Sequence, residues 1–257
     1  MVVFLQELAA AAAEPALMRF RQNGHVENKS SLDFDPVTEA DRNAELAIRA
    51  LIKARFPTHG IVGEEFGVEQ GDAEFVWVID PIDGTRAYIS GLPTWGTLVG
   101  LLQHGRAVAG LISQPFTGEV FVAGSDGAFF SRAGAPLLPI RTRQTKALSD
   151  ATLMTTSPAL YSGVSADRYA ALEAKVKLVR YGLDCYAFAM LAAGHADLVV
   201  EPELQTYDIA GVIAVIEQAG GVVTTWSGER AETGGNVVAA ATADLHAAAM
   251  AVLAEQS

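Results

Sequence analysis

The sequence predicts an α/β protein built as two packed halves, and three observations support this. Half of its 257 residues are hydrophobic, which is enough for one large domain or two intimately packed halves. Between residues 94 and 131, short β-type segments alternate with turns, a pattern typical of an antiparallel meander. After residue 150 strands and helices alternate, which indicates a mixed α/β layer. We predict halves at 1–144 and 145–257, divided within the polar segment 141–150.

The first half begins with two predicted helices. Residues 2–22 form an amphipathic pattern that Pro15 should kink or divide. Its expected apolar face comprises Phe4, Leu5, Leu8, Leu17 and Phe20. A second helix opens at Thr38, where Asp41 three residues later resembles a capping box, and residues 57–60 stop it. Its expected buried stripe continues through Leu46, Ala50 and Leu51.

The remaining elements follow from hydrophobic runs and turn residues. In the first half we predict strands at 60–62, 75–79, 98–102, 108–112, 119–123 and 128–131. In the second half we predict strands at about 151–156, 177–181, 197–201, 222–225 and 237–241. The interleaved helices are predicted at about 166–174, 185–193, 208–219 and 243–254.

Composition argues against several classes of function. The net charge is -12 with only 18 scattered Lys and Arg, so we expect no nucleic-acid binding. Cys185 is the only cysteine, which rules out an intrachain disulfide and a cysteine-based zinc site, and helical spacing separates it too far from His195 for a thiol dyad. Residues 1–20 lack a basic start and contain Glu7 and Glu14, unlike a signal peptide. With no apolar run of about 18 residues, we expect no membrane span and a cytoplasmic protein.

An acidic turn after the strand 75–79 is the most informative segment. Pro81 has no N–H and forces Asp80 into an extended conformation, so we expect the strand to end there. In the following turn Asp80 and Asp83 can converge on one point, with the Ile82 carbonyl facing the same way. Oxygen ligands without a basic partner repel one another unless a hard divalent cation such as Mg²⁺ binds between them.

The same turn can also bind an anion. Gly84 allows close backbone approach, and the N–H groups of Gly84 and Thr85 can begin a helical turn. An ordinary strand-end turn is the alternative. Two further acidic positions argue against it: the pair Glu64 and Glu65 after another short strand, of which only one should enter the site, and Asp208. Asp208 is also a candidate N-cap of the helix that follows, and the two roles are compatible.

Residues 63–65, 80–85 and 207–208 together resemble the signature of the inositol monophosphatase superfamily of lithium-sensitive phosphatases. Residues 36–41 and 219–222 fit the same pattern, so the resemblance spans nearly the whole chain. It implies a layered αβαβα sandwich of the inositol monophosphatase and fructose-1,6-bisphosphatase type. It also implies a homodimer, two or three Mg²⁺ ions per site and a small phosphate ester as substrate.

The resemblance also implies roles for individual residues. The metal ligands it implies are Glu64, Asp80, the Ile82 carbonyl, Asp83 and Asp208. Thr85, supported by Asp41, would act with Glu64 on the attacking water, and the Gly84 and Thr85 amides would hold phosphate oxygens. Lys29 occupies a position where the family often has a lysine near the metals, but a solvated surface lysine is the alternative. Phosphoryl transfer depends on positioning and charge neutralisation, so no protein nucleophile is required.

Three residues are candidates for substrate binding: Asp184, Glu201 and Arg86. In the family the position of Glu201 contacts the alcohol part of the substrate, whereas Asp184 replaces a residue that is small in inositol-cleaving relatives. Two carboxylates suit a cation better than a neutral polyol. Residues 83–88 and 90–93 also resemble the histidinol-phosphatase branch. The alternatives are that Asp184 is the N-cap of the next helix and that Arg86 forms a surface salt bridge.

We therefore predict a Mg²⁺-dependent phosphatase that hydrolyses L-histidinol phosphate, a reaction of histidine biosynthesis. The alternatives are an inositol-1-monophosphatase or another small sugar-phosphate phosphatase and, from a different class, a non-catalytic member that binds metal or a partner. A nucleotide substrate with a second phosphate is disfavoured, because the sequence has no basic cluster for it.

Overall fold

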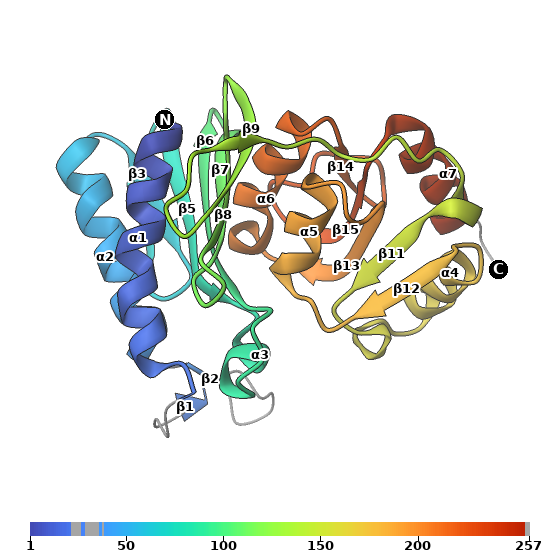
Figure 1. Cartoon of the computed structure of the whole chain (residues 1–257), viewed down its shortest axis with the longest axis horizontal. Helices are drawn as coiled ribbons and strands as arrows, with labels where there is room; N and C mark the ends of the chain where they lie inside the picture. Colours follow the sequence, from blue (N-terminus) through green and yellow to red (C-terminus); the bar gives the residue numbers. More distant parts are fainter. Residues whose placement is uncertain (22–26, 29–35, 38, 255–257) are drawn as a thin grey trace.

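The protein folds into five alternating layers of helices and sheets, which Figure 1 shows side by side. The structure, a computed structural model, describes residues 1–21, 27–28, 36–37 and 39–254. The predicted αβαβα sandwich is confirmed. Lys29 and Thr38 lie outside the described residues, so their predicted roles stay predictions. In the described part of the chain, no helix is long and apolar enough to cross a membrane.

The first two layers are a helix pair and an eight-stranded sheet. Helices α1 (Val2–Arg19) and α2 (Glu39–Arg55) pack on one face of the sheet, whose strand order is β10-β9-β8-β7-β6-β5-β3-β4. These strands are β3 (Gly60–Gly63), β4 (Gly67–Glu69), β5 (Phe75–Asp83), β6 (Gly96–Gln103), β7 (Arg106–Gln114), β8 (Glu119–Gly124), β9 (Gly127–Arg132) and β10 (Leu138–Pro139). Strands β6 to β9 form the predicted antiparallel meander, whereas β3 and β5 pair in parallel. Three short elements flank the sheet: β1 (Glu27–Asn28), β2 (Pro36–Val37) and α3 (Thr85–Ile89).

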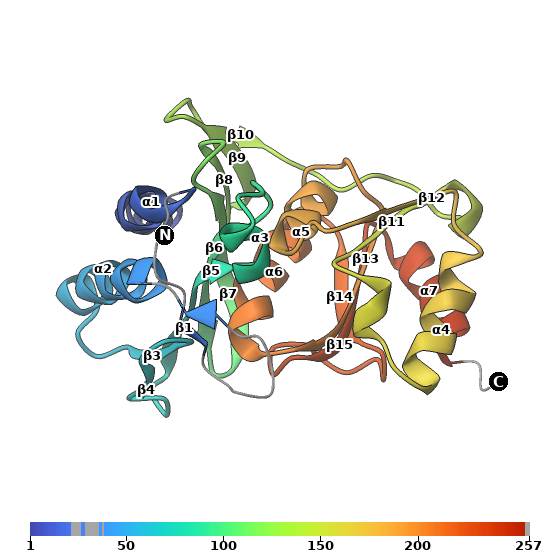
Figure 2. The same cartoon turned by 90° about the horizontal axis from the view of Figure 1, so that it is seen from below.

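The other three layers belong to the second half of the chain. Helices α5 (Cys185–Ala192) and α6 (Thr206–Gln218) lie between the two sheets and carry much of the largest buried apolar cluster (Figure 2). The second sheet has the order β12-β11-β13-β15-β14, and α4 (Val164–Glu173) and α7 (Ala243–Ala254) cover its outer face. Its strands are β11 (Thr152–Thr155), β12 (Leu178–Tyr181), β13 (Leu198–Leu204), β14 (Val222–Thr225) and β15 (Gly235–Ala240). Two short 3₁₀ turns complete the half, η1 (Leu148–Asp150) and η2 (Pro158–Leu160).

Helix α6 joins the two halves, because it packs against β6 and β7 of the first sheet as well as against α5. The first sheet ends at β10 and the second begins after η1, so the chain passes between the sheets in the segment 140–147. The division into domains 1–144 and 145–257 stays a prediction.

Helix α1 differs from the sequence prediction in two ways. It runs from Val2 to Arg19 without a break at Pro15, so the expected division of the helix is wrong. Leu17 is 37 % exposed and was wrongly placed on the apolar face. The buried stripe instead follows a spacing of four residues, which leaves Leu17 beside it. Its members are Phe4, Leu8, Ala12, Ala16 and Phe20, and Leu5 and Ala9 beside them are also buried.

The predicted buried stripe of α2 is wrong. Leu46 is 50 % exposed, Ala50 is exposed and Leu51 is half-buried. The apolar stripe is Ala44, Ile48 and Ile52. Two charged residues, Glu45 and Arg49, lie on the same buried side. Because charged residues are expected in water, their burial hid the true face of the helix.

Strand β5 does not end at Asp80 as predicted. It pairs with β6 as far as Asp83, and the register shifts between Asp80 and Asp83. Pro81 is tolerated at this irregularity because a missing N–H breaks no regular ladder bond there, while its carbonyl accepts a hydrogen bond of 2.8 Å from Thr97 Oγ1.

Candidate metal centre and substrate pocket

Three carboxylates from distant parts of the chain converge at the end of β5. Asp80, Asp83 and Asp208 each offer an oxygen, and these oxygens lie within 4.8 Å of one another. The irregularity in β5 separates the first two along the strand, and α6 supplies the third. Asp208 is the third residue of α6, so its expected N-cap position is wrong by three residues. It still helps to cap the helix, since its Oδ2 accepts a 2.6 Å hydrogen bond from the N–H of Gln205.

Burial and mutual repulsion raise the pKa values of this cluster. Burial raises the pKa of Asp80 well above its ordinary value, and neighbouring carboxylates raise it further, Glu64 the most. Burial also raises the pKa of Asp83, with Asp184 as the next cause, and raises that of Asp208 to about 6. The three side chains therefore resist carrying three negative charges in the absence of a cation.

The donor set fits a hard divalent cation. Asp80 is 2 % exposed, and its Oδ1 is buried with no hydrogen-bond partner among the described residues. A buried, unpaired carboxylate oxygen beside two further carboxylates is stabilised by oxygen-seeking ions such as Mg²⁺. Asp80, Asp83 and Asp208 are the residues of this structure that would hold such an ion.

The two adjacent glutamates after β3 have different surroundings. Glu64 acts electrostatically on Asp80, and its N–H donates to the Ile79 carbonyl at 3.1 Å, so it lies beside the carboxylate cluster. The buried Glu65 side chain instead pairs with Arg42 at 3.7 Å. Asp41, on the first turn of α2, is 2 % exposed and also contributes to the raised pKa of Asp80. Asp41 and Glu64 thus belong to the same acidic region as the three aspartates.

The turn after Asp83 brings the two halves of the protein into contact. Gly84 has a left-handed φ of 79°, and a Cβ on it would lie 2.9 Å from Cβ and Cγ of Asp184. Only glycine meets both conditions without strain. Thr85 begins α3, and its Oγ1 donates to the Ile82 carbonyl at 3.3 Å. The residues predicted to bind phosphate therefore lie directly beside the carboxylate cluster.

A cavity of about 520 Å³ opens over this turn. Asp83, Asp208 and Gly84 line the wall next to the carboxylate cluster, which we call the metal side. Asp184 and Glu201, from the second half of the chain, also line the cavity. The exposed Arg86 lies on its rim, and its charge lowers the pKa of Asp184, so the two lie near each other. Two of the predicted metal ligands, Asp83 and Asp208, and all three predicted substrate residues thus line the pocket, whereas Glu64, Asp80 and Ile82 do not.

Asp184 precedes α5 in an unusual conformation. Its φ of 46° and ψ of −140° are normally restricted to glycine. It occupies the N-cap position, but its side chain makes no capping hydrogen bond within the described structure, which argues against capping as the reason for an aspartate here. Burial raises its pKa to about 6, while the Thr94 side chain and, to a smaller extent, the charge of Arg86 act in the opposite direction. The next residue, the buried Cys185, donates its N–H to Asp83 Oδ2 at 2.7 Å.

Glu201 lies in β13 and is 3 % exposed. Its Oε1 accepts hydrogen bonds from the N–H of Thr156 at 2.6 Å and from Thr156 Oγ1 at 3.0 Å. Burial raises its pKa to about 8 in spite of these bonds. Glu201 is consequently held in one orientation at the pocket wall.

Several residues that line the pocket were not predicted as site residues, among them Thr156 and Leu160. Thr156 directly follows the end of β11, just as Asp83 lies at the end of β5. A polar residue at the end of a strand was therefore a signal that could have predicted Thr156. No comparable signal marks Leu160.

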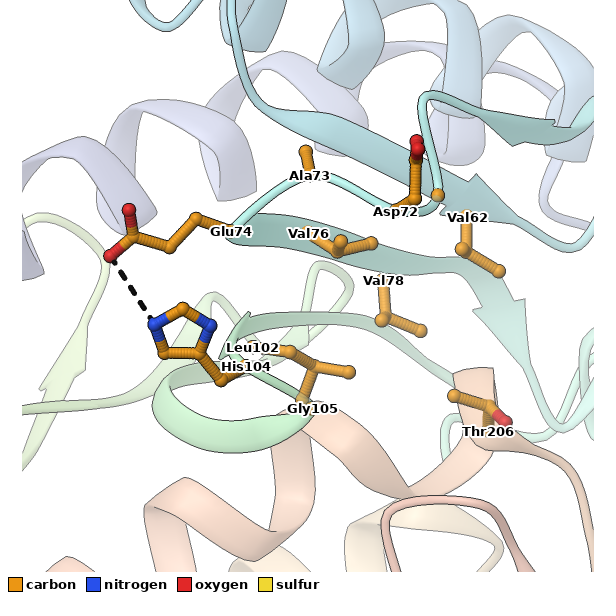
Figure 3. Close-up of a pocket in the computed structure, with 11 residues that line it drawn as sticks. Val62, Asp72, Ala73, Glu74, Val76, Val78, Leu102, His104, Gly105 and Thr206 are labelled. Atoms are coloured by element: carbon orange, nitrogen blue, oxygen red, sulfur yellow. Dashed lines mark ion pairs between the residues drawn. The ribbon is translucent and has the colours of Figure 1, made fainter.

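A second cavity, of about 570 Å³, is lined in part by Thr206, the first residue of α6 (Figure 3). Val62, Val76 and Val78 point into it, and an ion pair of 3.6 Å between Glu74 and His104 stands at its rim. None of the predicted site residues lines this cavity. The carboxylate pocket is therefore the candidate active site.

Comparison with known proteins agrees with this geometry. The model of the inositol monophosphatase family matches residues 1–257. The chain is 41 % identical to the bifunctional phosphatase IMPL2, chloroplastic, of Arabidopsis thaliana, over 95 % of this chain and 72 % of that protein. It is 36 % identical to a histidinol-phosphatase of Streptomyces coelicolor, over 91 % of this chain and 90 % of that protein. A solved structure of an inositol monophosphatase from Zymomonas mobilis matches with a TM-score of 0.87 and 36 % identity, over 98 % of this chain and 96 % of that one.

Proposed function

The chain belongs to the inositol monophosphatase family, and on that premise we propose that its substrate is L-histidinol phosphate. Membership makes it a metal-dependent phosphomonoesterase, in agreement with the cluster of Asp80, Asp83 and Asp208. The proposal concerns the identity of the alcohol that is released when the phosphate ester is hydrolysed.

The pair of carboxylates on the second-half side of the pocket carries the proposal. Asp184 and Glu201 line the cavity opposite the metal side. Asp184 adopts a strained backbone and its side chain makes no capping hydrogen bond in the described structure, so capping does not account for an aspartate at the pocket wall. Histidinol phosphate carries an ammonium and an imidazole, either of which can pair with a carboxylate. A neutral polyol would leave the largely buried Asp184 with only the exposed Arg86 at the rim as an opposite charge. The similarity to a histidinol-phosphatase over nine-tenths of both chains supports the same choice.

We assign the chemistry to the predicted residues as follows. Two or three Mg²⁺ ions, when bound, would neutralise the phosphate and polarise its oxygens. Asp80, Asp83, Asp208, Glu64 and the Ile82 carbonyl would hold them. The amides of Gly84 and Thr85 would orient the phosphate, as N–H groups at a helix start suit an anion. Thr85 Oγ1, supported by Asp41, would with Glu64 orient and activate the attacking water, and a carboxylate rather than the neutral hydroxyl would accept the proton.

Inositol monophosphate is the second candidate, and one observation favours it. The raised pKa of Glu201, about 8, leaves this side chain largely protonated at neutral pH. A neutral carboxyl held by Thr156 suits a hydroxyl group better than a cation. The solved inositol monophosphatase with a TM-score of 0.87 shares the fold at 36 % identity.

A side-by-side assay separates the two substrates. Phosphate release from L-histidinol phosphate and from myo-inositol 1-phosphate is measured with Mg²⁺, and we expect the higher kcat/KM for histidinol phosphate. Preference for the inositol ester would refute the proposal. Asp184→Asn should lower kcat/KM for histidinol phosphate by about 10- to 100-fold more than for the inositol ester, since it removes only the paired charge. Asp167→Asn, an exposed aspartate on α4, is the matched control.

A catalytic role for the cluster is tested by Asp83→Asn. We expect loss of turnover on both esters, whereas an active variant would contradict the assignment of Asp83 as a metal ligand. The non-catalytic alternative predicts Mg²⁺ binding by wild-type protein without phosphate release.

We further propose that the protein is a homodimer in solution, which light scattering coupled to gel filtration would test. The cytoplasmic location stays a prediction.

A further inference from the structure

A buried ion pair on α2 contacts the turn that follows Glu64. The Glu45 side chain is completely buried and Arg49 is 6 % exposed. Glu45 Oε1 accepts a 2.7 Å hydrogen bond from Arg49 Nε, one helical turn away. Neither residue lines the substrate pocket or belongs to the carboxylate cluster.

Glu45 binds the backbone on the far side of Glu64. Its Oε2 accepts the N–H of Glu65 at 2.8 Å, and its Oε1 accepts the N–H of Phe66 at 3.3 Å. The N–H of Glu64 itself donates to the Ile79 carbonyl on β5. The backbone is therefore fixed immediately before and after the Glu64 side chain.

The residue before Glu64 leaves room for this arrangement. A Cβ on Gly63 would lie only 1.9 Å from Glu45 Oε1. The carboxylate thus takes the space that a side chain at position 63 would need.

Arg49 holds the other end of the turn. Its Nη2 donates to the Gly67 carbonyl at 2.5 Å, and its Nη1 lies 3.5 Å from Glu69 Oε2 on β4. Lys53, one turn further along α2, pairs with the same Glu69 at 2.7 Å. The two ends of the turn between β3 and β4 are thereby tied to one helix.

We propose that Glu45 and Arg49 are positioning residues that fix the Glu64 carboxylate toward the metal centre. This inference rests on the proposed role of Glu64 as a metal ligand. A buried ion pair is a weak source of stability, since desolvation offsets its attraction. Here each partner also binds backbone groups of one turn, which an apolar pair of equal size could not do. Partners that orient a metal ligand govern metal affinity nearly as strongly as the ligand itself.

The test measures Mg²⁺ affinity directly, by isothermal titration calorimetry without substrate. Glu45→Gln keeps the size of the side chain but turns one acceptor into a donor that faces a backbone N–H or Arg49. We expect the Mg²⁺ dissociation constant to rise by about 10- to 100-fold. For the ester, we expect kcat at fixed Mg²⁺ to fall while KM stays within about twofold, because the substrate side of the pocket is unchanged.

A second pair of variants guards against misfolding. Arg49→Lys keeps the charge beside Glu45, whereas Arg49→Met removes it, so Mg²⁺ affinity should stay closer to wild type in Arg49→Lys. Asp197→Asn is the matched control, because Asp197 is also a fully buried acid that accepts a backbone N–H, from Thr152 at 2.8 Å, and pairs with an arginine, Arg143, at 3.2 Å. It should lower the melting temperature and leave Mg²⁺ affinity unchanged.

The outcomes separate this inference from the proposed function. Wild-type Mg²⁺ affinity in folded Glu45→Gln or Arg49→Met protein would overturn the positioning role, and so would an equal loss in Asp197→Asn. If the wild-type protein binds Mg²⁺ but releases phosphate from neither ester, the proposed function fails. A selective loss of Mg²⁺ affinity in the α2 variants would then still support the positioning role.

Discussion

Replacing Asp80 by asparagine should stabilise the metal-free protein and greatly reduce the stabilisation that Mg²⁺ adds. One carboxylate oxygen of Asp80 lies within 4.8 Å of one oxygen each of Asp83 and Asp208. The Oδ1 atom of Asp80 has no hydrogen-bond partner in the described structure. Two unit charges at that separation repel by about 3 kcal/mol at an effective dielectric constant of ~20. Because the raised pKa values show that the cluster already keeps some protons, we expect a net gain of about 1 to 3 kcal/mol. For a chain of this size that is a rise of roughly 2 to 10 °C in Tm.

The stability of the metal-free protein should fall as pH rises. The pKa of Asp208 is raised from 3.8 to about 6, so the folded state holds a proton that the unfolded state releases above about pH 4. Metal-free wild-type protein therefore loses stability as the pH rises through this window and beyond, where Asp80 also resists ionisation. The advantage of Asp80→Asn should be larger at pH 8 than at pH 5.

Thermal melting followed by circular dichroism, with EDTA and with Mg²⁺, tests both parts. Wild-type protein should gain about 2.7 kcal/mol when Mg²⁺ is present at 100 times its dissociation constant, and the variant should gain much less. A metal-free Asp80→Asn protein that melts below wild type, or that keeps the full Mg²⁺ response, would refute the reasoning.

Three further predictions concern single positions. Gly84→Ala should lower the free energy of unfolding by about 1–2 kcal/mol and raise KM, because a Cβ at φ 79° would lie 2.9 Å from Asp184; urea unfolding and ester kinetics measure both. In wild type, the raised pKa of the buried Glu201 makes the free energy of unfolding fall as pH rises from 4.5 to about 8, and Glu201→Gln should reduce this fall. Urea titrations at several pH values measure it. On α2, Ile48→Ala should cost about 2–5 kcal/mol and Leu46→Ala less than about 0.5 kcal/mol in urea unfolding; equal losses would contradict the corrected helical face.

The individual helices and strands were predictable because their sequence patterns are local, whereas the layered αβαβα arrangement was predicted from the family resemblance. The alternation in the second half predicted every described strand and α-helix to within a few residues, and Ala243–Ala254 was predicted at its observed bounds. The short strands β4 and β10 were missed, since two or three residues carry no periodic signal. The exposed position of Leu46 could not be seen, because identifying the buried face required knowing that Glu45 is paired inside the protein.

The convergence of Asp80 and Asp83 was predictable for a different reason. Acidic residues that follow a buried strand without basic neighbours indicate a cation, whereas the ligand role of Asp208 was predicted from the family resemblance. The contact between Gly84 and Asp184 was not predictable, because it depends on how α5 docks against the first sheet. The role of Glu45 likewise depends on a turn 20 residues away in sequence.

The contact between Gly84 and Asp184, which we call the seam, joins two groups of residues that can change separately in evolution. The phosphorus chemistry is assigned to the β5 turn, Glu64 and the start of α6, whereas the surface facing the leaving alcohol comes from the segments around α5 and β13. A lineage could therefore exchange one alcohol for another by altering the second set, with the hydrolytic apparatus untouched. The glycine at the seam is the exception: any larger residue there would disturb both sets together.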